Sequence, residues 1–216
     1  MTDTQLRQDV LDELEFEPSI NAANVGAAVK DGVVTLTGHV SSYSQKITAE
    51  VAARRVRGVR AIAQEMEVRY AGERLTSDDE IAKRALDSLR WSTTVPDENV
   101  KLTVDNGWIT LNGEVDWQFQ KMSAENAVRN LLGVIGVSNL ISVKPRVQAA
   151  DIKGKIEAAL KRRAEVEANA IRVSVVNDKV TLNGSVDNWD EREAVENAAW
   201  SAPGVRFVED HLTIGR

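Results

Sequence analysis

The sequence predicts an α+β fold made of three tandem αββαβ units, each with two helices packed on one face of a three-stranded mixed sheet. Two observations lead to this prediction. A glycine motif recurs three times in fixed register, and apolar residues switch between helical and strand spacing inside each copy. The expected copies cover residues 1–72, 76–145 and 148–216.

The motif T-L-x-G-x-V marks the same strand in each copy, and its glycines are offset by 75 and then 71 residues. A second glycine, followed each time by valine, recurs at the same offsets. The two sets are Gly38, Gly113 and Gly184, and Gly58, Gly133 and Gly204. Motifs that keep one register without a gap indicate that a single unit was triplicated. We expect all six glycines to be structural, at close backbone contacts and helix stops.

Each copy starts with a helix, because Leu6, Val10 and Leu14 and their counterparts share one helical face. Two alternating strands follow, joined by Asp31-Gly32 in the first copy, a dipeptide suited to a tight hairpin. A second helix runs from about residues 44, 119 and 190 to just before the second glycine. The last strand, at 62–68, 137–143 and 208–214, should pair parallel to the second strand through a right-handed crossover.

Composition excludes several classes of protein. The chain has 43% hydrophobic and 28% charged residues, and its apolar runs are too short to span a membrane. The absence of cysteine excludes disulfides, thiolate metal sites and cysteine nucleophiles. A net charge of −6 disfavours non-specific nucleic-acid binding. The acidic, polar start has no signal-peptide pattern, so we expect a cytoplasmic protein, with peripheral membrane contact as an option.

Catalysis is not expected. His39 and His211 have no counterparts in the other copies, and the chain contains no phosphate loop, dinucleotide fingerprint, metal-ligand spacing or serine elbow. We therefore predict a protein that is not an enzyme and that uses no cofactor and no metal.

The pattern G-V-x-x-V-x-[NDQ]-x-[LIM]-x-[VI], together with the central G-x-V, resembles the BON domain of bacterial proteins, and the resemblance covers nearly the whole chain. Its polar position is filled by Gln64, Asn139 and Asp210. The resemblance implies a non-catalytic role in envelope or osmotic stress, with binding of anionic phospholipid or membrane surfaces; one relative of the family is associated with potassium. This chain departs from the best-known members in having three copies and no export signal.

Basic residues gather at two helix ends and are the first candidate contact site. They are Arg54, Arg55, Arg57 and Arg60 in the first copy and Lys161, Arg162 and Arg163 in the third. Each cation near an anionic bilayer contributes about 1 kcal/mol. The alternative is that these cations only complement the helix macrodipole, at about 0.3–1 kcal/mol each.

Aromatic residues gather where the second helix begins, at Tyr43, Trp117, Phe119 and Trp189. Such side chains suit a bilayer interface or a protein contact, and packing against a neighbouring copy is the alternative. We expect Phe16, Trp91 and Trp200 to pack at helix ends. Gln64, Asn139 and Asp210 should either form a strand-entry bulge or bond a helix-end amide, with a ligand-binding role as the alternative.

Three functions remain open from the sequence. The first is contact with anionic lipid surfaces, the second is protein interaction or self-assembly into an oligomer, and the third is binding of potassium or another small cation through backbone carbonyls.

Overall fold

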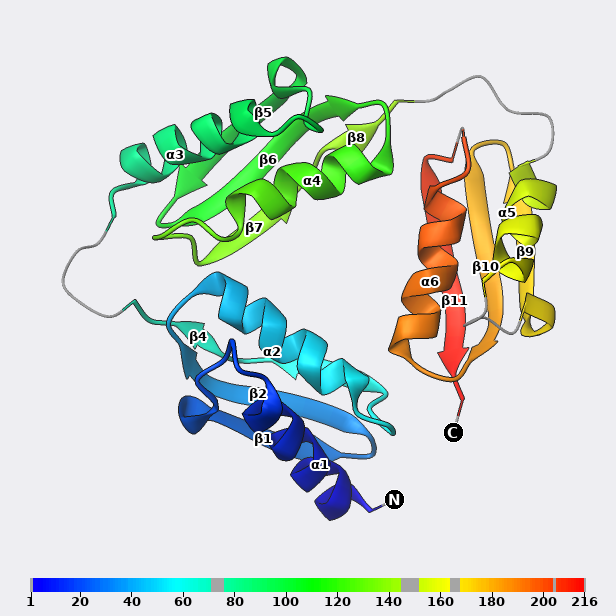
Figure 1. The fold of residues 1–216 in the computed structure, drawn as a ribbon, viewed down its shortest axis with the longest axis horizontal. Coiled ribbons are helices and arrows are strands. Elements are labelled where there is room, and N and C mark those ends of the chain that lie inside the picture. Colours follow the sequence, from blue (N-terminus) through cyan, green and yellow to red (C-terminus); the bar gives the residue numbers. More distant parts are fainter. Residues whose placement is uncertain (1, 71–75, 145–151, 164–167, 204, 216) are drawn as a thin grey trace. The chain divides into compact units, whose positions relative to one another are not determined.

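The computed structural model describes residues 2–70, 76–144, 152–163, 168–203 and 205–215. It confirms the α+β class and the threefold αββαβ repeat, with both helices of each copy on one face of its sheet (Figure 1). The first copy contains α1 (Asp3–Phe16), β1 (Val25–Lys30), β2 (Val33–Val40), α2 (Tyr43–Arg55), β3 (Ala61–Gln64) and β4 (Glu67–Val68). The second contains α3 (Asp78–Trp91), β5 (Val100–Asp105), β6 (Trp108–Val115), α4 (Gln118–Val128), β7 (Gly136–Asn139) and β8 (Ser142–Val143). The third contains α5 (Ile152–Lys161), β9 (Ile171–Val176), β10 (Lys179–Val186), α6 (Trp189–Trp200) and β11 (Phe207–Ile214).

The sheet order, which the sequence does not reveal, places the second strand of each copy in the middle. β1 pairs antiparallel with β2, and β3 pairs parallel with β2, as the crossover helix requires. In the first copy the last strand is divided, but Val33 faces Ala61 and Val40 faces Val68, so one register runs through both pieces. In the third copy β11 is continuous.

The hairpins turn at the predicted dipeptides. Asp31 and Gly32 have φ angles of 52° and 78°, the left-handed pair that a tight turn needs. The first helix holds this turn, because a carboxylate oxygen of Asp3 accepts a hydrogen bond from the Asp31 amide at 2.9 Å. Asp78 does the same for Asn106 in the second copy, at 2.8 Å. The acidic first turn of α1 and α3 therefore fixes the helix against its own hairpin.

The central glycine of β2 is held by a close backbone contact. Gly38 has a φ of 101°, and a Cβ atom there would lie 2.0 Å from the Asn24 carbonyl oxygen. A Cβ atom at Gly113 would lie 2.0 Å from the Asn99 carbonyl oxygen, and one at Gly184 would lie 2.1 Å from the Ala170 carbonyl oxygen. No side chain fits in this space, so the strand backbone itself packs on the segment that enters β1. Gly58 and Gly133 have φ angles of 98° and 95° after the second helix, and Gly204 lies outside the described residues.

Each core lies between the sheet and its two helices. Leu6, Val10 and Leu14 of α1 are buried against Val34 and Leu36 of β2 in one apolar cluster. The second helices contribute mostly alanine, such as Ala49, Ala52 and Ala53 of α2, which lets that helix lie close to the sheet. The third copy repeats this arrangement in a cluster of its own.

Candidate functional site

The repeated polar residue of the last strand bonds to the second helix of its own copy. Gln64 donates to the Lys46 carbonyl at 3.5 Å, and Asn139 donates to the Lys121 carbonyl at 2.8 Å. Each side-chain oxygen also accepts from the amide two residues ahead. The side chain thereby ties the strand to the helix through a helix carbonyl, and not through the helix-end amide that we expected.

In the third copy this position is an aspartate, and a second carboxylate lies beside it. Asp210 accepts from Arg192 at 2.6 Å and from the Leu212 amide at 2.7 Å. Burial, together with the hydrogen bond and the charge of Asp210, raises the pKa of Glu196 to about 7. Burial alone would raise the pKa of Asp210, but its hydrogen bonds with Glu196, the Leu212 amide and Arg192 lower it. Arg192 also stacks 5.2 Å from the Trp189 ring centre, so its charge is used locally.

The basic cluster of the first copy is largely neutralised. Arg54 forms an ion pair with Glu50, and the Arg55 guanidinium lies 3.6 Å from Glu17 and 3.8 Å from Glu13. Arg57 and Arg60 are exposed, and neither has an ion pair among the described residues. The sequence could not show this neutralisation, because Glu13 and Glu17 come from a different helix.

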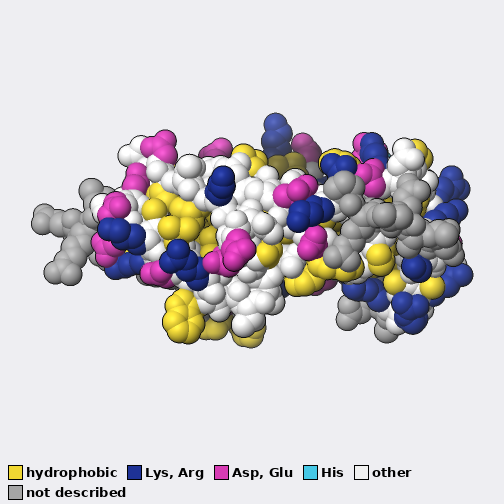
Figure 2. All heavy atoms as spheres, turned by 90° about the horizontal axis from the view of Figure 1, so that it is seen from above, with side chains coloured by type: hydrophobic (Ala, Val, Ile, Leu, Met, Phe, Trp, Pro, Cys, Tyr) yellow, Lys and Arg dark blue, Asp and Glu magenta, His cyan; other side chains and the backbone are white. Residues whose placement is uncertain are grey.

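The basic cluster of the third copy has no ion pair among the described residues. Lys161, Arg162 and Arg163 are exposed at the end of α5, and no described carboxylate lies within ion-pair distance of them. Lys155, which our sequence analysis missed, is also exposed and unpaired within the described ranges. It precedes Arg162 by seven residues, about two helical turns, so helical spacing could have identified it. We name Lys155, Lys161, Arg162 and Arg163 the basic end of α5. On the face shown in Figure 2, lysine and arginine side chains gather over the third copy.

The predicted aromatic residues differ in exposure. Tyr43, Trp117 and Trp189 are half-buried at the start of the second helices. Phe119 is 55% exposed, and so its ring does not face the core of its copy. Tyr43 belongs to the first copy, Trp117 and Phe119 belong to the second, and Trp189 belongs to the third, so no single copy contains all four.

The prediction that Phe16 and Trp91 pack at helix ends is wrong. Their side chains are 84% and 87% exposed. Each follows a buried leucine, Leu14 or Leu89, by two positions, which is about 200° around the helix and therefore on the opposite face. Trp200, by contrast, packs against the core of the third copy as predicted.

Neither the cavity nor the clusters of potential metal ligands give a candidate binding site among the described residues. The first copy has a cavity of about 330 Å³ whose lining includes His39, Arg69 and Tyr70. Arg69 is engaged by Glu67 at 2.7 Å, so the cavity presents no unpaired arginine. In the described part of the chain no three His, Asp or Glu side chains come together as a metal site. None of the described helices is long and apolar enough to cross a membrane.

The family model for the BON domain matches three times, at residues 2–70, 77–145 and 148–216. The chain belongs to the BON domain family. Its three BON domains are similar to osmotically-inducible protein Y of Escherichia coli (strain K12), with 29% identity over 153 residues, 67% of this chain and 74% of that protein.

Two solved structures also match over nearly the whole chain. A chain of CdsD, a structural protein of the type III secretion system of Chlamydia trachomatis, is 16% identical, with a TM-score of 0.27; the match covers 98% of this chain and 92% of that one. The C-terminal domain of CdsD is 14% identical, with a TM-score of 0.28 and full coverage of both chains. Scores this low say nothing about the function of these BON domains.

Proposed function

We propose that this chain is a non-catalytic binding protein whose third BON domain contacts anionic phospholipid surfaces through the basic end of α5. One observation carries the proposal. Three exposed cations lie at the C-terminal end of α5, and a fourth, Lys155, lies about two turns before Arg162 on the same side of the helix; none of the four has an acidic partner among the described residues. The arginines at the end of α2 are weaker candidates, because Glu50 and Glu17 already take up the charges of Arg54 and Arg55.

The expected binding is weak and depends on salt. At about 1 kcal/mol for each cation near an anionic surface, four cations supply about 4 kcal/mol, which corresponds to a dissociation constant of about 1 mM. The net charge of −6 opposes approach of the rest of the chain. Because the Debye length is about 8 Å at physiological salt, this repulsion is felt mainly by the parts of the chain nearest the surface.

The similar protein's name, osmotically-inducible protein Y, supports a role during osmotic stress. We propose the same setting here, with the chain in the cytoplasm and attached reversibly to the membrane surface. The helices described give it no anchor of its own, so attachment would depend on the lipid charge.

Vesicle flotation tests the proposal. We expect the chain to float with vesicles of phosphatidylcholine and phosphatidylglycerol at low salt, and not with phosphatidylcholine alone or at high salt. The triple variant Lys161→Gln, Arg162→Gln, Arg163→Gln should lose flotation. The matched control Arg54→Gln, Arg55→Gln removes charges that are already paired and should float like the unmodified chain. Absence of charge-dependent flotation of the unmodified chain would overturn the proposal.

A further inference from the structure

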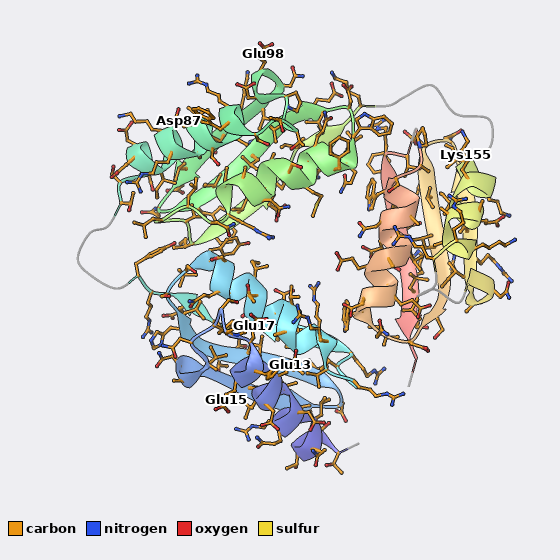
Figure 3. All side chains as sticks on the ribbon, viewed as in Figure 1. Glu13, Glu15, Glu17, Asp87, Glu98 and Lys155 are labelled. Atoms are coloured by element: carbon orange, nitrogen blue, oxygen red, sulfur yellow. The ribbon has the colours of Figure 1, made fainter. Side chains whose placement is uncertain are left out.

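We propose that the end of α1 is a docking surface for the basic end of α5 of a second copy of this chain. We name Asp12, Glu13, Glu15, Phe16 and Glu17 the acidic end of α1; Figure 3 labels Glu13, Glu15 and Glu17 on this helix and Lys155 on α5. The acidic end of α1 takes no part in the proposed lipid contact, whereas the basic end of α5 is used in both proposals; the docking inference stands whether or not lipid binds there.

The two helix ends are matched position by position. The repeat offsets align Glu15 with Lys161, Phe16 with Arg162, and Glu17 with Arg163. Residues 15, 16, 161, 162 and 163 are all exposed. Over their helical spans, α1 carries five carboxylates and one arginine, whereas α5 carries three lysines and one glutamate. Opposite charge at aligned positions gives the two helix ends complementary potentials.

The acidic end of α1 is also unfavourable for its own helix. The C-terminus of a helix carries a partial negative charge, so cations stabilise it and carboxylates do not. The last turn of α1 contains no basic residue. Among the described residues, Arg55 is the only cation within ion-pair distance of these carboxylates, and it is shared between Glu13 and Glu17. Cations from a partner would remove this unfavourable interaction.

The equivalent helix of the second copy shows that the acidity is not needed for the fold. Most of the carboxylates of α3 are compensated on the helix itself: Lys83 bonds Asp79 at 2.7 Å, Arg84 pairs with Glu80, and Arg90 lies 3.9 Å from Asp87. The acidic surplus is therefore specific to α1, and not a property of every first helix in this chain.

Phe16 provides an apolar centre for the docking surface. Its ring is 84% exposed and lies among carboxylates, which disfavours an anionic membrane as its partner. An arginine guanidinium can stack on an aromatic face while its charge is met by flanking carboxylates. Arg162, at the aligned position of α5, has the required chemistry and is itself unpaired within the described part of the chain. Because the two surfaces differ, the contact is heterologous, and each chain can bind one neighbour at each end.

Two charge-reversed chains test the contact. The acid-reversed variant carries Asp12→Lys and Glu15→Lys; the base-reversed variant carries Lys161→Glu and Arg162→Glu. In sedimentation velocity at low salt and without lipid, we expect the unmodified chain to gain mass as its concentration rises and to return to the single-chain mass at high salt. Each variant alone should stay at the single-chain mass. An equal mixture should gain mass, because the intact acidic end of one variant then meets the intact basic end of the other, and the two reversed ends also carry opposite charge.

The sedimentation of the equal mixture decides whether the docking proposal stands. A gain in mass by the mixture, and by neither variant alone, supports the proposal and shows that both variants are folded. A mixture that stays at the single-chain mass overturns it, and so does an unmodified chain that stays at that mass throughout, as pairing of the two ends within one chain would require. The matched control Asp87→Lys, Glu98→Lys, at positions labelled in Figure 3, should associate like the unmodified chain. The acid-reversed variant adds cations to α1, so lipid binding is judged from the flotation of the unmodified chain, and association is judged separately from sedimentation without lipid.

Discussion

The ends of α1 and α5 hold equivalent places in two copies of one fold, yet only their inner faces are alike. Leu14 and Leu160 align, and both side chains are 1% exposed. On the outer face, Glu15 and Phe16 of α1 face solvent where α5 has Lys161 and Arg162. Core packing therefore constrains the buried face of the helix and leaves the exposed face free to diverge. Functional differences between the copies are therefore expected on their exposed faces.

The shared inner face gives the largest expected effect. Leu14→Ala and Leu160→Ala should each lower the free energy of unfolding of their own copy by about 2–5 kcal/mol, because each leaves a cavity in a closely packed core. Urea unfolding of the full chain, with hydrogen exchange to locate the affected copy, measures the loss. Glu15→Ala and Lys161→Ala, one residue further along, are matched controls that should change stability by no more than about 0.5 kcal/mol. A loss below about 1 kcal/mol at either leucine would show that the inner faces are not equivalent.

This equivalence explains how much the sequence could predict. The spacing of Leu6, Val10 and Leu14 and the Asp31-Gly32 turn are local signals, and they predicted the elements and the pairing direction correctly. Strand order, by contrast, depends on contacts between distant segments, which periodicity does not report.

The candidate surfaces were predicted less well for the same reason. The pairing of Arg55 with Glu17 joins two helices that are far apart in the sequence, so the first basic cluster looked freer than it is. Phe16 and Trp91 were assigned to packing on residue type alone, although their spacing from Leu14 and Leu89 places them outside the core. Helical spacing would also have added Lys155 to the basic end of α5.

Transferring the basic residues of α5 to the end of α1 tests whether the exposed residues alone determine lipid binding. The variant Glu15→Lys, Phe16→Arg, Glu17→Arg gives α1 the residues that α5 has at the same positions. Three added cations at about 1 kcal/mol each should raise binding to phosphatidylglycerol vesicles by about 100-fold at low salt. Flotation across a lipid titration measures the gain. Unchanged flotation would mean that charge at this helix end does not reach the lipid surface.

A smaller effect on stability is expected from the paired carboxylates Glu196 and Asp210, which occur only in the third copy. Glu196 has a folded pKa of about 7 against a usual value of 4.5, so the folded third copy binds its proton more tightly than the unfolded chain does. Its contribution to stability is complete below about pH 4.5 and is lost as the pH rises to about 7. The side chain is 37% exposed, and solvent screening keeps this loss below about 1 kcal/mol.

Urea unfolding between pH 4.5 and 8 measures this slope. Glu196→Gln should remove it, because an amide does not titrate. Asp210→Asn should flatten it, since it installs the amide that the second copy has at Asn139 beside Glu125. A slope that persists in Glu196→Gln would assign the pH dependence to other groups.

The smallest effect is expected where α2 meets the acidic end of α1. Arg55→Ala removes the cation that lies 3.6 Å from Glu17 and 3.8 Å from Glu13. The arginine side chain is 48% exposed, and exposed ion pairs contribute little to stability, so thermal unfolding should shift only slightly. The same change leaves the acidic end of α1 more negative. Self-association at low salt should therefore strengthen even though the fold is marginally weakened. Opposite signs in these two measurements would show that Arg55 competes with a partner's cations for the same carboxylates, whereas weaker association would mean that Arg55 positions them.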